Sequence, residues 1–156
     1  RPPLVYGPGM KGSLLALFKA AQLGVPLPLA SIKNARDFLG RDSLDDLVCR
    51  CVAAPAGTPR ILLACDGEPV SSAGLYRRIG TALGKPARSF PFPSRLLRTA
   101  AQATGRGAMA DSLLSSLRID DTATRAALGW RPVLDLQVGL DATGAWYRSR
   151  SGAQGA

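Results

Sequence analysis

Apolar residues recur every three or four positions between residues 14 and 23, which predicts an amphipathic helix. The apolar face of this helix comprises Leu14, Leu17, Phe18 and Ala21. Ser13 is expected to cap the start of the helix, and Gly24 is placed to end it. A face of this width must be buried against other elements, so the pattern indicates a packed domain.

The same spacing and the same start and stop signals predict further helices. One is expected to begin at Asp42 as its N-cap, and the next to run from Ser71 or Ser72 to Gly84. Another is expected to open at Pro93-Ser94 and to end at Gly105, and a short segment follows at 107–114. A small helix over about 122–128 and a last one capped by Asp135 complete the set.

Short extended segments separate these helices. They are expected at residues 1–6, 25–30, 36–40, 61–65 and 87–92. The apolar run 61–65 is typical of a buried strand, whereas Pro26 and Pro28 restrict the 25–30 segment to a sheet edge. The pattern therefore predicts an α/β fold that is mostly helical with short strands.

Composition narrows the class of protein. The chain has 156 residues, a length that suits one domain, and its apolar runs are shorter than a transmembrane helix requires. Twenty Lys and Arg residues against eleven acidic ones give a net charge of +9, which would suit nucleic acid, an anionic membrane or a nucleotide. The basic residues are scattered rather than clustered, which favours dispersed, solvated charge over a nucleic-acid footprint, and neither nucleic acid nor a membrane is expected as a partner.

The residue types exclude several kinds of site. The chain has no His, which rules out Ser-His-Asp and Cys-His arrangements and argues against a zinc site. Cys49, Cys51 and Cys65 form no C-x-x-C pair, and we expect reduced, buried thiols of a cytoplasmic protein. No glycine-rich phosphate loop follows a strand. The residues alone indicate no catalytic constellation and no metal site.

Three segments of the chain, called phrases below, resemble sequence motifs of a known family. The first is RPPLVYGPG at residues 1–9, the second is NARDFLGRDSL at 34–44, and the third comprises IDDT at 119–122 with LGWRP at 128–132. In this order and at these separations they resemble the C-terminal, substrate-binding portion of extended short-chain dehydrogenases/reductases. Within that group the chain is most similar to the NAD-dependent epimerase/dehydratase family, in particular to UDP-glucose 4-epimerase-like members.

The resemblance implies a two-domain enzyme of which this chain lacks the N-terminal Rossmann domain. Residues 1–10 would then be the remnant of the Rossmann domain and its linking loop, 11–149 the substrate-binding domain, and 150–156 a flexible tail. The missing half would hold NAD or NADP and supply the catalytic Tyr-x-x-x-Lys. No Tyr of this chain is followed four residues later by Lys, so the chain alone is expected to be inactive and to bind no cofactor.

The resemblance also implies roles for individual residues. Arg36 matches the Arg that contacts the diphosphate of a nucleotide-sugar, and Lys11 and Ser13 lie at a helix start that suits an anion. Further substrate-binding candidates are Tyr6, Leu29 and Arg118, with Arg106 as a neighbouring alternative. Pro2 and Pro3 match the edge of the cofactor site. Structural roles are the alternatives: capping for Ser13, packing for Tyr6, and an edge strand around Leu29.

The expected partner is a UDP-sugar or a related nucleotide-sugar, and the expected reaction is hydride transfer at sugar C4. A 4-ketoreductase or dehydratase of the same family is an alternative, and a stand-alone basic module for an anionic partner is another. The family resemblance implies a homodimer built by the missing domain. The isolated chain is expected to self-associate through the apolar surface that this domain would cover.

Overall fold

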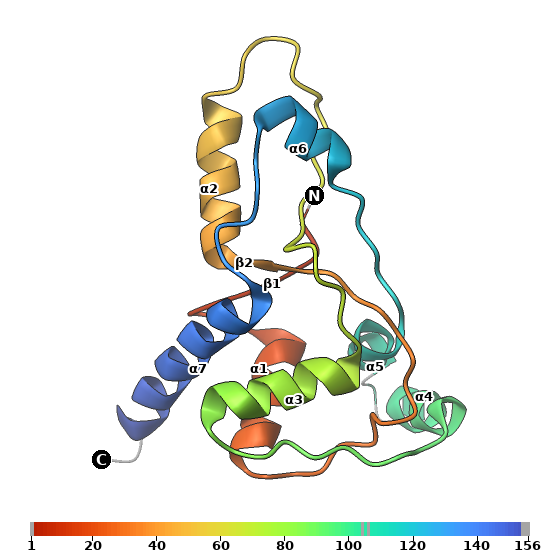
Figure 1. Cartoon of the computed structure of the whole chain (residues 1–156). Helices are drawn as coiled ribbons and strands as arrows, with labels where there is room; N and C mark the ends of the chain where they lie inside the picture. The colour runs from red at the N-terminus through yellow and green to blue at the C-terminus, as the bar shows by residue number, and fades with distance from the viewer. Residues whose placement is uncertain (1, 104, 106, 154–156) are drawn as a thin grey trace.

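The computed structural model describes residues 2–103, 105 and 107–153. Two short parallel strands lie at the centre of the arrangement (Figure 1). β1 (Leu4–Tyr6) pairs with β2 (Phe38–Gly40), with Leu4 opposite Phe38 and Tyr6 opposite Gly40. Parallel pairing requires a crossover connection, and helix α1 (Gly12–Gln22) lies in the segment that provides it.

The larger core lies below the strands in the view of Figure 1. There α1 packs against α3 (Ser72–Leu83), and α3 packs against α7 (Leu136–Ala153). The apolar face predicted for residues 14–23 is buried at this junction together with residues of α3 and α7, among them Tyr76, Ile79 and Leu140. α4 (Ser94–Ala103) and α5 (Gly107–Leu114) pack on each other beside this core.

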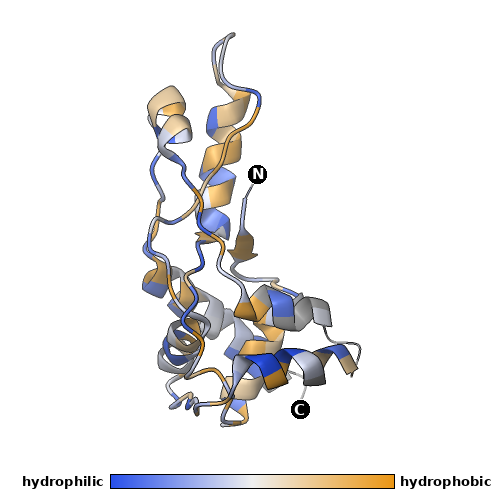
Figure 2. Ribbon diagram, turned by 90° about the vertical axis from the view of Figure 1, so that its right-hand side faces the viewer, coloured by the Kyte–Doolittle hydropathy of each residue, from blue (hydrophilic) through white to orange (hydrophobic). Residues whose placement is uncertain are grey.

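The narrower upper part contains α2 (Arg41–Val52) and α6 (Thr122–Leu128), as Figure 1 shows. A smaller core of Leu39, Leu47, Ala64 and Trp130 joins them. Figure 2 shows apolar residues along much of α2, and several of them are not buried. Val52 is 85% exposed and Ile61 is 58% exposed, so this part of the chain leaves apolar side chains in contact with solvent.

The structure confirms several helix boundaries that the sequence predicts. Ser71 caps α3, because its Oγ accepts a hydrogen bond from the amide of Gly74 at 3.0 Å. Gly84 and Gly129 follow α3 and α6 in the left-handed conformation, where a glycine meets no steric penalty. The predicted small α/β unit of helices and short strands is likewise what the described residues form.

Two predicted caps are wrong. α1 begins at Gly12 with Lys11 in the N-cap position, so Ser13 lies inside the first turn. α2 begins at Arg41 after Gly40, so Asp42 lies in its first turn, where a carboxylate still favours the helix dipole. In both cases the N-cap lies two residues before the predicted capping residue, directly after the preceding turn or within the preceding strand.

Other predictions also need correction. Residues 61–65 form no strand, and directly after them Asp66 N donates a hydrogen bond to Phe38 O of β2 at 2.8 Å. Cys49 and Cys51 are exposed, and of the three thiols Cys65 is the buried one. α7 continues to Ala153, within the stretch predicted as a flexible tail from 150, and residues 154–156 lie outside the described residues. No helix in the described ranges is long and apolar enough to cross a lipid bilayer.

Candidate functional site

The segment around Arg36 lies between two others that are distant in sequence. The amide of Arg36 donates to Val70 O at 3.0 Å, and the amide of Val70 donates back to Arg36 O at 3.0 Å. On its other side Asp37 N donates to Leu117 O at 2.8 Å, and Leu117 N donates to Ala35 O at 3.0 Å. Side chains alternate along such an extended segment, so Arg36 and Asp37 point to opposite sides.

Asn34 fixes this segment to the C-terminal end of α5. Its amide nitrogen donates to Leu113 O at 2.9 Å, to Ser115 O at 3.1 Å and to Ser72 Oγ at 3.1 Å. Its Oδ1 accepts from the amide of Ser72 at 2.9 Å. Asn34 is buried, so these bonds are made away from water, where an unpaired polar group is costly.

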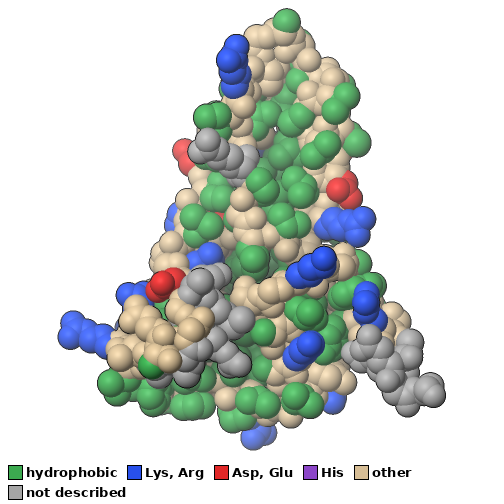
Figure 3. All heavy atoms as spheres, turned by 180° about the vertical axis from the view of Figure 1, so that it is seen from behind, with side chains coloured by type: hydrophobic (Ala, Val, Ile, Leu, Met, Phe, Trp, Pro, Cys, Tyr) green, Lys and Arg blue, Asp and Glu red, His purple; other side chains and the backbone are tan. Residues whose placement is uncertain are grey.

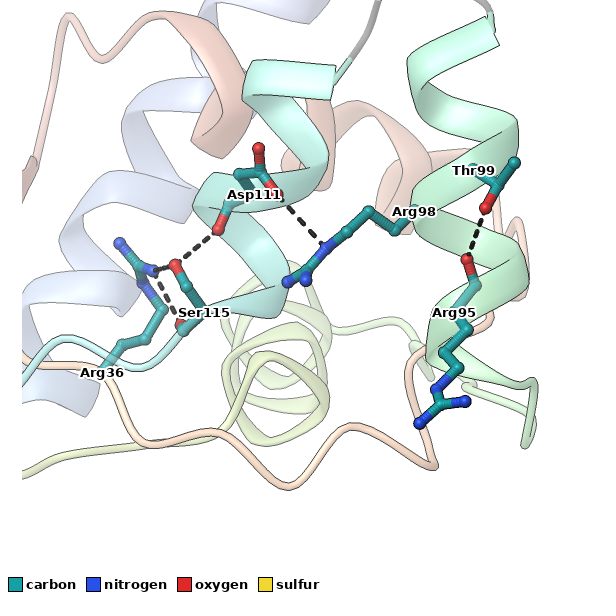
Figure 4. Close-up of polar contacts among 6 residues, drawn as sticks. All are labelled: Arg36, Arg95, Arg98, Thr99, Asp111 and Ser115. Atoms are coloured by element: carbon teal, nitrogen blue, oxygen red, sulfur yellow. Dashed lines mark hydrogen bonds and ion pairs between the residues drawn. The ribbon is translucent and has the colours of Figure 1, made fainter.

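The guanidinium of Arg36 contacts Ser115, whose backbone carbonyl also accepts a hydrogen bond from Asn34. Arg36 Nη1 donates to Ser115 O at 2.8 Å and to Ser115 Oγ at 3.0 Å, while Ser115 Oγ donates to Asp111 O (Figure 4). Arg98 reaches Asp111 from the other side of α5, with Nε 3.3 Å from Oδ1. Arg36 is therefore oriented by a neutral partner, and its charge is not balanced by any carboxylate of the described residues.

Arg36 retains hydrogen-bonding capacity. Its recorded bonds within the described ranges all use Nη1, which leaves Nε and Nη2 on the other edge of the guanidinium plane. Partial burial lowers the pKa of Arg36, but a guanidinium stays charged at any physiological pH. The Nε and Nη2 groups of a half-buried guanidinium with a fixed orientation can donate to two oxygens of one phosphate or carboxylate.

Asp37 and Arg118 lie on the opposite side of the segment. Asp37 is 2% exposed and accepts a hydrogen bond from Ile119 N at 2.6 Å. Arg118 Nε lies 3.5 Å from the Asp37 carboxylate, and the Arg118 side chain is 64% exposed. The structure thus brings Arg118 to the segment that contains Arg36, but pairs it with Asp37. Arg106 lies outside the described residues.

The remaining candidates are distributed over other parts of the molecule. Lys11 is exposed and Ser13 half-buried at the start of α1. Leu29 is buried in the larger core at 4% exposure. Pro2 lines a pocket of about 580 Å³ beside α2, and Pro3 is half-buried. Pro2 lies in a pocket with residues of α2, and Lys11 lies in another pocket with Lys19 and Arg150; neither of these two linings includes Arg36.

Tyr6 is buried and has a structural partner. Its hydroxyl donates to Asp66 Oδ2 at 2.7 Å, and the same oxygen accepts from Gly40 N at 3.0 Å. Burial and the adjacent carboxylate raise the pKa of Tyr6, and burial raises the pKa of Asp66. The pair joins β1 and β2 to the loop that follows residues 61–65.

Sequence reasoning did not identify Asn34, Ser115 or Asp66 as important. Asn34 and Ser115 are 81 residues apart, and no local pattern connects them. A signal was present for Asn34 alone, because it lies inside one of the three phrases quoted above and is the one asparagine of the chain.

The fold is shared with solved structures of nucleotide-sugar epimerases. UDP-glucose 4-epimerase from Thermotoga maritima, solved with UDP-glucose, matches 95% of this chain and 44% of its own, with a TM-score of 0.67 and 17% identity. UDP-glucuronic acid 4-epimerase from Bacillus cereus, solved with NAD, matches 94% of this chain and 42% of its own, with a TM-score of 0.69 and 15% identity. At these identities the likeness establishes the fold.

A curated relative adds similarity in sequence. The chain is 34% identical over 144 residues to UDP-glucose 4-epimerase from Vibrio cholerae, an alignment that covers 92% of this chain and 44% of the relative. No family model matches the chain. The predicted resemblance to UDP-glucose 4-epimerase-like members of the epimerase/dehydratase family is confirmed. The chain spans less than half the length of the curated relative.

Proposed function

We propose that this chain forms the nucleotide-sugar-binding part of an NAD(P)-dependent UDP-sugar 4-epimerase-like enzyme. Two observations support the proposal: the sequence similarity to an epimerase over nearly the whole chain, and the oriented, unpaired guanidinium of Arg36. NAD(P) would supply a hydride acceptor for sugar C4. The role of the present residues is to hold the diphosphate and thereby orient the sugar, which lowers the entropic part of the barrier.

The single observation that carries the proposal is the unused edge of Arg36. Ser115 engages Nη1 and thereby fixes the plane of the guanidinium, so that Nε and Nη2 face an incoming ligand as a fixed pair. A UDP-sugar presents paired phosphate oxygens with roughly two negative charges, which match this geometry and charge. Arg118 is paired with Asp37 on the opposite side of the segment, so it would have to leave that carboxylate to contact the same ligand.

The test is a calorimetric titration of the chain with UDP-glucose, UDP and uridine. We expect weak binding, because the described residues provide few contacts to a ligand of this size, and we expect UDP to bind more tightly than uridine. Arg36→Met should weaken UDP binding about 10- to 100-fold, the range for one lost charge-assisted interaction.

Arg88→Met is the matched control. Arg88 is exposed, and it takes part in the fold through its backbone carbonyl, which accepts from Leu27 N at 3.1 Å. It should retain the wild-type affinity. Equal UDP affinity for the wild type and Arg36→Met, or equal affinity of the wild type for UDP and uridine, would contradict the proposal.

A further inference from the structure

A second basic site lies between α1 and α7, away from Arg36. One wall is the face of α1 that carries Leu15 and Lys19, and the other wall is the C-terminal half of α7. The pocket measures about 330 Å³, which is within the usual range for small-molecule sites. Its lining comprises Gly9, Met10, Lys11, Leu15, Lys19, Trp146, Tyr147 and Arg150.

The charge of this α1–α7 pocket is of one sign. Lys11, Lys19 and Arg150 contribute three cations, and no acidic residue is part of the lining. None of the three forms an ion pair with a carboxylate in the part of the chain that the structure describes. Seen from behind in Figure 3, Lys and Arg side chains lie with apolar ones over the lower part of the face. Like charges gathered in one pocket repel one another, and a bound anion would remove that cost.

The pocket also has an apolar, aromatic wall. The guanidinium of Arg150 lies 5.8 Å from the ring centroid of Trp146, a cation–π arrangement that holds both side chains at the pocket. The ring of Tyr147 is fixed from the core side by Phe18, with 5.7 Å between the ring centroids. Leu15 completes an apolar surface on which a flat ring can lie.

The spacing of the cations indicates the shape of a ligand. Lys11 precedes α1 in the N-cap position and Lys19 lies in its last turn, eight residues later, a spacing of about 12 Å along the helix axis. A single inorganic anion cannot reach both, whereas a ring joined to a chain of phosphates can. Ser13 is not part of the lining, so this pocket lies on a different face of α1 from that residue.

We infer that the α1–α7 pocket binds a nucleoside phosphate, with its ring on Trp146 and Leu15 and its phosphates among Lys11, Lys19 and Arg150. This site does not include Arg36, but it includes Lys11, which the family resemblance assigns to nucleotide-sugar binding. A ligand here would bridge the start of α1 and the end of α7.

The test is a fluorescence titration of the chain with ADP in the absence of divalent metal. Trp130 is fully buried, so quenching by a ligand reports on Trp146. We expect saturable quenching by ADP, and affinities at least about tenfold weaker for adenosine and for inorganic phosphate, each of which fills half of the pocket. Trp146→Phe should abolish the quenching.

Lys11→Glu should weaken ADP binding about tenfold or more. Lys11 lies in the N-cap position of α1, where a negative charge favours the helix dipole, so this variant should keep its fold. Lys33→Glu is the control, because Lys33 is exposed, lies outside the pocket and gives the same change in net charge. Arg36→Met should leave the quenching by ADP unchanged, because that signal comes from Trp146 in the α1–α7 pocket.

Three outcomes would overturn the inference. The first is an absence of saturable quenching by ADP in the wild type. The second is an equal loss of affinity in Lys33→Glu and Lys11→Glu, which would indicate attraction by net charge alone. The third is a loss of ADP binding in Arg36→Met with full binding in Lys11→Glu, which would place ADP at the other site.

Discussion

Replacement of Asn34 tests whether one buried amide holds the candidate site together. Asn34→Ala removes contacts with Ser72 N, Ser72 Oγ, Leu113 O and Ser115 O, in which the two N–H groups of the amide are shared among three acceptors. Counted as two donated bonds and one accepted bond at about 1 kcal/mol of net stabilisation each, the loss would approach 3 kcal/mol if no group found another partner. Leu113 O keeps its bond from Ser72 Oγ, and Ser115 O keeps its bond from Arg36, so we expect a loss of about 2 kcal/mol.

The measurement is urea unfolding of the purified chain, followed by circular dichroism. Gln102→Ala is the control, because Gln102 is an exposed amide side chain on α4 and should change the free energy of unfolding by less than about 0.5 kcal/mol. A change below about 1 kcal/mol for Asn34→Ala would refute the interpretation of Asn34 as the group that joins residues 34–37 to α5.

Asn34→Asp extends the test to pH dependence. The new carboxylate would keep the acceptor for Ser72 N but would face two backbone carbonyl oxygens that now accept from the Asn34 amide. Burial and these carbonyls should raise its pKa in the folded state above the ordinary value of about 3.9. A raised folded pKa contributes stability that is present below the unfolded pKa and is lost as pH rises. The variant should therefore be closest to wild type near pH 3 and weakest near pH 7, and a pH-independent difference would refute the argument.

Two further predictions concern the pair of buried Tyr6 and half-buried Asp66. Gly139→Ala would place a Cβ 2.7 Å from Tyr6 Cε2, so we expect a loss of about 1–3 kcal/mol in urea unfolding, and a loss below about 0.5 kcal/mol would contradict this packing. Burial raises the pKa of Asp66, so the stability that its protonated form contributes is present at low pH and is lost as pH rises. Asp66→Asn has no such titration, and its stability relative to wild type should increase from pH 3 to pH 7; a constant difference would show that Asp66 is not penalised when ionised.

Local signals determined most of what could be predicted about the fold. The glycines after α3 and α6 were identified correctly, because the left-handed conformation that ends a helix has a strong residue preference. The caps at Ser13 and Asp42 were wrong, because a serine or aspartate inside the first turn has the same local pattern as one at the N-cap. The run 61–65 is apolar enough for a strand, but a strand also needs a neighbour at hydrogen-bonding distance, and no local pattern supplies that information.

In the candidate site, the sequence predicted only a residue that lies in a motif resembling the family. Arg36 was identified through the NARDF phrase, whereas Ser115 forms the contact that orients it and is separated from it by 79 residues. A contact over that separation depends on how α5 packs beside residues 34–37, which periodicity does not determine. Tyr6 lies in the first phrase, yet its partner Asp66 is 60 residues away and follows a run whose structure was predicted wrongly.

The structure shows where the net positive charge of the chain is balanced by carboxylates and where it is not. A net charge of +9 spread over scattered residues indicates no particular partner. In the structure, most of the ion pairs of the described residues lie in the upper part and along the edge formed by α4 and α5: Arg41 and Arg50 on α2 pair with Asp45 and Asp46, and Arg125 on α6 pairs with Asp121. Arg36 and the cations of the α1–α7 pocket have no carboxylate partner among the described residues.

An anion binds most favourably to unbalanced positive charge at partly enclosed positions, because such positions screen charge less than open surface does. The distribution of the counter-charges, more than the total charge, therefore identifies where phosphate-bearing ligands should bind.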